Sequence, residues 1–347
     1  MEGSECIMID SNSLITWFKQ NKRDLPWRHT TNPYFIYISE IMLQQTRAES
    51  VIPYYNRFIN ELPTIESLAN VDNDKLLKLW EGLGYYSRAK NLKQSAIMIV
   101  QKFNGLFPKV YEELIQLKGI GEYTAGAILS RAFNLPYAAI DGNALRVLSR
   151  LNEDSRDISL NKTKQAFKKE IESMNIQEFN IFNEALMELG ATVCTFKTPK
   201  CTICPFNLTC KAYQNNTIMF FPNNQRKIQK KHLNYTCIFL CNQKNQFYFK
   251  IKEEGVLKDL YSPILIDSHL TVQQLSKFIS SDDFQIKEIF PLSDQKHIFT
   301  HQTWHMKGYL LKVNSKNSKN FYSIYQIKKQ INIPICFQKF FKELNIN

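Results

Sequence analysis

The sequence predicts a multidomain protein in which an all-α region is followed by a small α/β domain. With 347 residues, the chain is too long for one ordinary hydrophobic core, since domains average roughly 150 residues. Apolar residues recur at helical spacing through the first two thirds of the chain. Beyond about residue 233 the spacing changes to two, which is typical of β-strands. We therefore expect a helical region over 1–214, a linker over 215–232 and the α/β domain over 233–347.

The helical region is predicted from apolar residues that recur every three or four positions. This spacing marks helices at 36–43 and 75–80, and Asp74 is a suitable N-cap for the second. Six further helices are expected at 87–104, 110–116, 123–133, 142–151, 160–173 and 176–190. Gly105 can terminate the helix at 87–104.

The α/β domain is predicted from runs of β-branched and aromatic residues. Runs at 235–241 and 246–251 flank a polar stretch, which indicates a β-hairpin. Two more strands are expected at 309–313 and 321–327, and two helices at 270–280 and 335–344. The segment 215–232 is polar and basic without a clear period, and it is interpreted as a linker.

The charge of the chain favours a polyanionic partner. It has 44 basic and 32 acidic residues, a net charge of +12. Each phosphate that such a protein contacts releases counterions, so nucleic acid is the expected partner, with general Lys enrichment as the alternative explanation. No segment resembles a membrane span, and the acidic start is unlike a secretory signal. We therefore expect a cytoplasmic protein.

Four of the eight cysteines form a candidate metal site, with the spacing Cys-x6-Cys-x2-Cys-x5-Cys. In a cytoplasmic protein such cysteines serve as thiols or ligands rather than disulfides. Four thiolates are a complete ligand set for an iron–sulfur cluster. Structural zinc more often uses two Cys-x2-Cys pairs, and this segment has one. An iron–sulfur cluster is therefore expected, with zinc or a metal-free loop as alternatives, at Cys194, Cys201, Cys204 and Cys210.

Residues 117–128 (Leu-Lys-Gly-Ile-Gly-Glu-Tyr-Thr-Ala-Gly-Ala-Ile) predict two helices joined by a tight turn. Gly119 and Gly121 permit a left-handed backbone and close approach of another molecule. Amides at the start of the following helix face outward, where an anion binds. The turn is therefore expected to hold a DNA phosphate without reading bases, with an ordinary glycine-containing turn as the alternative.

Two carboxyl groups are candidates for acid and carboxylate roles. Glu40 lies in an otherwise uncharged, apolar-rich helix, where burial raises the pKa of a carboxyl. Asp141 precedes a helix, whose dipole and free amides favour the ionised form. Glycosidic bonds are commonly cleaved by one carboxyl that protonates the leaving group and one carboxylate that stabilises the cationic sugar. Taken singly, each residue also has an ordinary structural explanation.

Together, the hairpin, the Asp141 segment and the cysteine quartet resemble the helix–hairpin–helix DNA glycosylases of the endonuclease III superfamily. Further stretches resemble its adenine DNA glycosylase (MutY) family: 25–28 (Leu-Pro-Trp-Arg), 39–46 (Ser-Glu-Ile-Met-Leu-Gln-Gln-Thr), 80–89 (Trp-Glu-Gly-Leu-Gly-Tyr-Tyr-Ser-Arg-Ala) and 182–190 (Phe-Asn-Glu-Ala-Leu-Met-Glu-Leu-Gly). The resemblance runs from about residue 14 to 225 and is weak beyond.

The resemblance implies excision of adenine opposite 8-oxoguanine or guanine in double-stranded DNA, with the adenine flipped out of the base stack. It implies one [4Fe-4S] cluster on the four cysteines, and we expect a monomer. Glu40 would protonate adenine N7 and Asp141 would stabilise the sugar cation, supported by Tyr123 and Asn143. The residues implied to contact bases are Trp27, Arg28 and Glu184 in the adenine pocket, Gln45 and Tyr85 in the base stack, and Thr46 and Leu83 near the oxidised guanine.

One substitution predicts the reaction type. Lyase members of the superfamily carry a Lys where this chain has Tyr123, and that amine forms a Schiff base that leads to strand cleavage. Tyr123 has no amine, so a monofunctional glycosylase is expected. Leu145 stands where some members have Lys, which removes one DNA contact.

The resemblance also implies a Nudix-like C-terminal domain that recognises 8-oxoguanine. The Gly-x5-Glu-x7-Arg-Glu signature is missing from the sequence, so no pyrophosphohydrolase activity is expected. The family's Phe-Ser-His loop corresponds to Phe299, Thr300 and His301. Thr300 keeps the hydroxyl and adds a methyl, so a lesion contact is expected, with a solvated loop as the alternative.

Two other functions remain open at this stage. One is a pyrimidine or thymine-mismatch glycosylase of the same superfamily, which the Gln44-Gln45-Thr46 sequence and the extra domain disfavour. The other is a non-catalytic iron–sulfur sensor of DNA damage, which the presence of both Glu40 and Asp141 disfavours.

Overall fold

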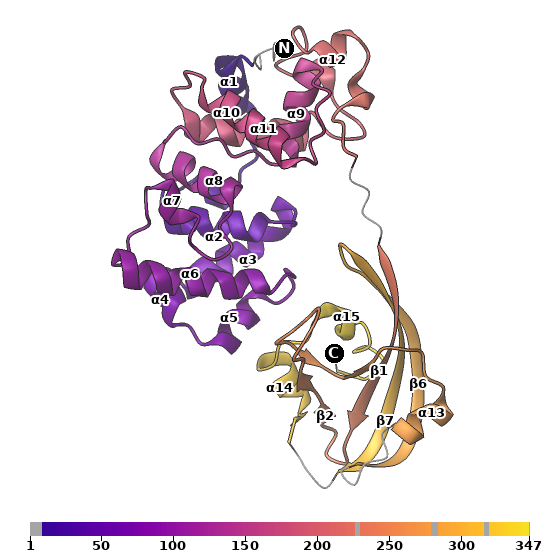
Figure 1. Cartoon of the computed structure of the whole chain (residues 1–347). Helices are drawn as coiled ribbons and strands as arrows, with labels where there is room; N and C mark the ends of the chain where they lie inside the picture. Colours follow the sequence, from indigo (N-terminus) through magenta and orange to yellow (C-terminus); the bar gives the residue numbers. More distant parts are fainter. Residues whose placement is uncertain (1–8, 226–229, 279–283, 316–318, 347) are drawn as a thin grey trace. The chain divides into compact units, whose positions relative to one another are not determined.

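The computed structural model describes residues 9–225, 230–278, 284–315 and 319–346 (Figure 1). The chain divides into two compact units, Met1–Val71 with Lys90–Arg226 and Asp72–Ala89 with Lys227–Asn347. The change of unit after Arg226 falls within the segment interpreted as a linker, of which 226–229 lie outside the described residues. The assignment of 72–89 to the second unit is unexpected, because this segment has the same helical pattern as its neighbours.

Helices make up the first unit. The helices predicted in this unit, other than 110–116, agree with the observed ones to within three residues at each end, and the 110–116 helix shortens to a single turn. The helices α1, α3 and α4 were not predicted. In chain order the helical elements are α1 (Ser11–Asn21), η1 (Pro26–Arg28), α2 (Pro33–Leu43), α3 (Ala48–Glu61), α4 (Ile65–Asn70), α6 (Ser87–Phe103), α7 (Tyr111–Leu114), α8 (Glu122–Phe133), α9 (Gly142–Asn152), α10 (Asn161–Glu172), α11 (Phe179–Thr192), η2 (Cys201–Ile203), α12 (Lys211–Gln214) and η3 (Ile218–Phe220). Among the described residues, no helix has both the length and the apolarity needed to cross a membrane.

The core beneath the cysteine segment is built from α1, α9, α10 and α11. Phe18, Leu148 and Phe182 are buried in it, and Cys194 packs against its edge. Gly190 brings α11 close to the start of α9, since a Cβ at Gly190 would lie 2.7 Å from Asn143 Cβ and 2.9 Å from its carbonyl oxygen. This contact fixes the distance between α11 and the start of α9, and therefore the position of Asp141, which precedes α9.

The second unit contains a six-stranded sheet in the order β6-β7-β1-β2-β8, with β5 also paired to β1. β1 runs parallel to β7 and antiparallel to β2 and β5. The elements are α5 (Asn73–Trp80), β1 (Lys231–Cys241), β2 (Phe247–Tyr248), β3 (Lys250–Ile251), β4 (Tyr261–Ser262), β5 (Ile264–Ile266), α13 (Val272–Phe278), β6 (Phe284–Ile298), β7 (Gln302–Ser315), β8 (Phe321–Tyr322), α14 (Ile324–Lys329) and α15 (Ile335–Gln338).

Both faces of this sheet are covered. Along β1, Cys237 and Phe239 face a core that includes Phe337 of α15, whereas Ile238 and Leu240 face a core that includes Leu275 of α13. Figure 1 accordingly places α13 and α15 on opposite sides of the sheet. The alternation follows from the period of two in a strand. The mixed α/β character is thus confirmed. The predicted hairpin is confirmed only for β1 and β2, because the run expected at 246–251 divides into β2 and β3, and β3 pairs with β4 in a separate sheet.

Several details of the second unit were predicted wrongly. The strand expected at 321–327 ends at Tyr322, because Ser323 and Gln326 form a capping box that starts α14. The helix expected at 335–344 ends at Gln338, and that at 270–280 is α13, with residues 279 and 280 outside the described part of the chain. β6 was not predicted. The N-cap of α5 is Asp72 rather than Asp74.

Replacing Gly190 with Ala is expected to destabilise the first unit by roughly 1–3 kcal/mol, because the added methyl collides with the Asn143 backbone. The measurement is thermal or denaturant unfolding. Gly142→Ala is the matched control: a Cβ there meets nothing within 4 Å, so it should change stability by less than ~0.5 kcal/mol. Equal stability of Gly190→Ala and the unmutated protein would contradict this packing.

Candidate active site

Glu40 lies on α2 with 3% of its surface exposed. Nη1 of Arg131 donates to Glu40 Oε1 at 2.6 Å, and the nearby Tyr123 hydroxyl, which donates to Met187 Sδ at 3.1 Å, also lowers the pKa of this carboxyl. Burial raises the pKa of Glu40, while Arg131 and Tyr123 act in the opposite direction without cancelling it. The predicted raised pKa is confirmed, so Glu40 is suited to carry a proton.

Asp141 is the N-cap of α9. Its Oδ1 accepts from the Ala144 N–H at 2.7 Å and its Oδ2 from Asn143 Nδ2 at 2.8 Å. Arg146 in turn donates to Asn143 Oδ1 at 2.8 Å, so Asn143 is held from both ends. The predicted capping geometry and the support from Asn143 are therefore present in the first unit.

The expectation that Asp141 has a lowered pKa is wrong. Burial raises the pKa of Asp141, and this outweighs the opposing hydrogen bonds from Ala144 and Asn143. The sequence pattern revealed the cap and its amides, but it did not reveal how deeply the carboxyl is buried. Both carboxyl groups of the candidate pair thus have raised pKa values.

The pocket residues expected beside Glu40 form a chain of ion pairs. Arg28 Nε donates to Glu184 Oε2 at 2.8 Å, and Arg28 Nη2 donates to Glu188 Oε2 at 2.9 Å. Arg131 Nε bonds the other oxygen of Glu184 at 2.8 Å. Trp27 is buried nearby, and its carbonyl accepts from Arg131 Nη2 at 2.8 Å. The structure therefore brings together Glu40 and the three residues expected to line an adenine pocket.

Two members of this chain, Arg131 and Glu188, were not singled out from the sequence as site residues. The signal that marked Glu40 also applied to Arg131, which is a charged residue within the otherwise apolar helix around Ala127, Ile128 and Leu129. Both Arg131 and Glu188 are buried. A buried charge requires partners: Arg131 bonds Glu40 and Glu184, and Glu188 bonds Arg23 and Arg28.

The two glycines of the helical hairpin differ in conformation. Gly119 has φ +78°, and a Cβ there would lie 3.1 Å from Asn91 Cβ, so glycine is favoured. Gly121 is extended at φ −101° and is the N-cap of α8, so the left-handed conformation expected of it is wrong. Around Gly121 a Cβ would meet nothing within 4 Å, which leaves room for another molecule. Glu122 bonds Gln165.

Gln45 and Tyr85, the residues expected to enter the base stack, share an uncommon conformation. Their φ values are +59° and +49°, in the left-handed region that non-glycine residues rarely adopt. Tyr85 is 45% exposed, and Gln45 is also exposed. Strained backbone of this kind concentrates at functional sites. Thr46 is half-buried beside Gln45, whereas Leu83 is buried.

In the second unit, the Tyr85 hydroxyl hydrogen-bonds Thr300 Oγ1. The two residues are 215 positions apart in the chain. Phe299 packs edge-on against Trp304 with ring centroids 4.9 Å apart, and His301 is exposed. The Phe299–His301 loop expected to contact the lesion therefore lies beside a residue expected to enter the base stack.

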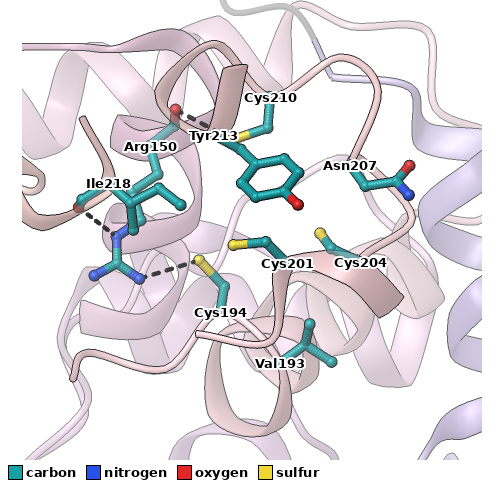
Figure 2. A pocket seen from close by; sticks show the side chains of 9 residues that line it. All are labelled: Arg150, Val193, Cys194, Cys201, Cys204, Asn207, Cys210, Tyr213 and Ile218. Atoms are coloured by element: carbon teal, nitrogen blue, oxygen red, sulfur yellow. Dashed lines mark hydrogen bonds between the residues drawn. The ribbon is translucent and has the colours of Figure 1, made fainter. Parts of the chain in front are cut away.

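The four clustered cysteines line one pocket, together with Arg150 and Tyr213 (Figure 2). Arg150 donates to the carbonyls of Thr195 and Phe196 at 2.7 and 3.0 Å, and its Nη1 lies 3.5 Å from Cys194 Sγ. Burial raises the pKa of Cys204 to about 12, so binding a cation there displaces protons. Among the described residues, no group of three His, Cys, Asp or Glu is arranged to hold a single metal ion. Four thiol sulfurs around one pocket fit the donor set of an iron–sulfur cluster.

Comparison with known proteins agrees with this site. The family of HhH-GPD superfamily base excision DNA repair proteins matches residues 38–173. An adenine DNA glycosylase of Buchnera aphidicola subsp. Baizongia pistaciae is 38% identical over 326 residues, which cover 91% of each protein. The chain belongs to the adenine DNA glycosylase family. A human adenine DNA glycosylase is 40% identical over 212 residues, covering 58% of this chain and 39% of the human protein.

Solved structures share the fold of the helical part. A thermostable thymine-DNA glycosylase has 29% identity and a TM-score of 0.54, covering 59% of this chain and 95% of its own. The match to the Buchnera protein is stronger evidence for the family than this structural similarity, because it extends across the second unit as well.

Proposed function

We propose that this adenine DNA glycosylase family member excises adenine paired with 8-oxoguanine or guanine from double-stranded DNA. Adenine glycosylase activity follows from membership of the family. The observation that carries the chemistry is the buried Glu40, whose pKa is raised, in the same unit as the Asp141 cap and the helical hairpin. The proposal includes a monomeric protein that acts on chromosomal DNA in the cytoplasm.

The reaction begins with adenine flipped into the pocket beside Glu40, at a cost of a few kcal/mol. Glu40 donates its proton to adenine N7, which makes the base a better leaving group. As the bond between the sugar and the base breaks, its electron pair leaves with adenine. The Asp141 carboxylate stabilises the positive charge that develops on the sugar. Water then adds to the sugar and completes the hydrolysis.

Because Tyr123 stands where lyase members have Lys, the expected product is an abasic site in an uncut strand. Strand cleavage by lyase members of the superfamily requires an amine that forms a Schiff base with the sugar. Tyr123 is half-buried beside Glu40, and desolvation together with that carboxyl raises its pKa well above the ordinary value. Its hydroxyl therefore stays protonated, and it donates a hydrogen bond to Met187 Sδ at 3.1 Å.

The second unit is proposed to be a Nudix-like domain that recognises the oxidised guanine. The Phe299–His301 loop is exposed at its tip, and Thr300 bonds Tyr85. A shared contact of this kind supports one lesion-reading surface made from Tyr85 and the loop. Gln45 and Thr46 are proposed to act from the first unit.

Cys194, Cys201, Cys204 and Cys210 are proposed to bind one [4Fe-4S] cluster. When bound, the cluster would cross-link these four cysteines and so hold the 194–210 segment in one conformation. Arg150 already anchors this segment through the Thr195 and Phe196 carbonyls. No residue that the mechanism uses lies in the segment, so its role is structural.

The thymine-mismatch alternative is supported by the thymine-DNA glycosylase structure, but that similarity covers only 59% of this chain. A non-catalytic sensor would not need the buried Glu40 and the half-buried Asp141, since desolvation of each carboxyl costs free energy. Adenine excision therefore has the stronger support.

Replacing Glu40 with Gln should lower single-turnover adenine release by ~10²–10⁴-fold while the lesion duplex still binds, because the amide keeps the shape but has no transferable acid. Release is measured from duplexes with A opposite 8-oxoguanine or guanine, alongside T opposite G and oxidised pyrimidines. The strand should stay intact until alkali cleaves the abasic site.

Glu178→Gln, at an exposed carboxylate that bonds Lys19, is the matched control and should leave release unchanged. Release of thymine or an oxidised pyrimidine in place of adenine would favour the other glycosylase. Binding to the lesion duplex without any base release by the unmutated protein would favour the sensor.

Iron and sulfide analysis of protein purified without oxygen should give about four of each per chain. Cys204→Ser removes one ligand and should lower both, together with DNA binding. Cys241→Ala, at a buried cysteine of the second unit, is the control and should keep the iron. One zinc ion per chain and no iron would contradict the cluster.

Tyr85→Phe and Thr300→Val each remove one hydroxyl of the observed pair. Each should weaken binding of an 8-oxoguanine duplex by roughly 2–10-fold, the value of one neutral hydrogen bond. Combined, they should cost no more than either alone. Tyr325→Phe, at an exposed hydroxyl on α14, is the control. Fully additive losses, or equal losses with a guanine duplex, would argue against a shared lesion contact.

A further inference from the structure

Arg131 lies at the centre of the candidate active site with 6% of its surface exposed. It belongs to α8, two turns beyond Tyr123. Three of its nitrogens have acceptors: Nη1 bonds Glu40 Oε1 at 2.6 Å, Nε bonds Glu184 Oε1 at 2.8 Å, and Nη2 bonds the Trp27 carbonyl at 2.8 Å. The planar guanidinium therefore connects three separate elements.

Such a group is costly to bury. A cation removed from water is tolerated only with charged partners in good geometry. Glu184 supplies a carboxylate and Glu40 supplies an acceptor oxygen, and Arg28 bonds the second oxygen of Glu184 at 2.8 Å. Both oxygens of Glu184 are thereby hydrogen-bonded, so Glu184 holds one side of the Arg131 guanidinium in place. The other side of the guanidinium donates to the Glu40 carboxyl.

We propose that Arg131 is a positioning residue for base excision, which orients the Glu40 carboxyl toward the flipped base and couples it to Glu184. This inference rests on the function proposed above. A guanidinium only donates hydrogen bonds, so Glu40 Oε1 is held as an acceptor. The transferable proton of Glu40 is thereby placed on Oε2. Without Arg131 the carboxyl is free to rotate and to carry its proton on either oxygen.

Arg131 also has an electrostatic effect that can be measured. The charged and titratable groups that face Glu40 are Tyr123 and Arg131 from α8 and Glu184 from α11. Arg131 favours the ionised form of Glu40, whereas burial and Glu184 disfavour it. An acid works in its protonated form, so the rate falls as the pH rises through the pKa of Glu40. Loss of Arg131 raises that pKa, and the fall should move to higher pH.

The test compares Arg131→Gln and Arg131→Lys in single-turnover adenine release from an A:8-oxoguanine duplex at a series of pH values. Arg131→Gln should release adenine ~10²-fold more slowly at neutral pH because the acid is misplaced. The alkaline fall in its rate should lie at higher pH than in the unmutated enzyme. Arg131→Lys keeps the charge, so it should retain the original position of this fall and recover part of the rate. Duplex affinity should change little in either variant.

Arg156→Gln is the matched control, since Arg156 also bonds two carboxylates, Asp154 and Glu170, outside the site. It should leave the rate and its pH dependence unchanged. Thermal unfolding and duplex binding identify a variant that does not fold. If Arg131→Gln is such a variant, Arg131→Lys decides through the recovered rate and the unshifted pH profile.

A slower Arg131→Gln whose pH profile matches the unmutated enzyme overturns the inference, because a purely structural defect lowers the rate equally at every pH. An Arg131→Lys variant as slow as Arg131→Gln overturns it as well. An unmutated enzyme that releases no adenine overturns the proposed function, and this inference with it. The two failures are therefore distinguishable.

Discussion

The candidate active site depends on one chain of buried ion pairs. Glu40 on α2, Arg131 on α8 and Glu184 on α11 are linked by hydrogen bonds of 2.6 and 2.8 Å. Arg28 extends the chain from Glu184 to Glu188. Removing one member leaves an uncompensated buried charge, which typically costs ~3–5 kcal/mol. The position of the acid is therefore fixed by helices that are far apart in the sequence.

Burial is the dominant influence on both carboxyl groups of the site. It raises the pKa of Glu40, which suits a proton donor. It also raises the pKa of Asp141, although the role proposed for that residue requires its ionised form. The Ala144 amide and Asn143 partly offset this effect. Asp141 thus depends on its hydrogen-bond partners more than a solvent-exposed helix cap does, which explains why Arg146 holds Asn143 from the other side.

The proposed lesion-reading surface combines residues that are distant in the chain. Tyr85 belongs to a segment that is helical like the first unit yet packs with the second. Asn332 in the C-terminal part bonds the Asp74 carbonyl, and Gln338 bonds Glu81, so the same segment has further contacts there. A strained backbone at Tyr85 and its bond to Thr300 occur together. The segment 72–89 therefore joins the proposed lesion-reading surface to the rest of the second unit.

The sequence by itself predicted most of the longer helices, the four cysteines proposed as ligands and the two candidate carboxyl groups, because helical periodicity, ligand spacing and local motifs are properties of neighbouring residues. Glu40 was recognisable as a charge in an apolar helix, and Asp141 as a residue before one. Only the tertiary structure decided the depth at which Asp141 is buried, the parallel pairing of β1 with β7, and the partners of Arg131. These three features depend on contacts between distant segments. Burial and ion pairing across such contacts produce no periodic pattern in the sequence.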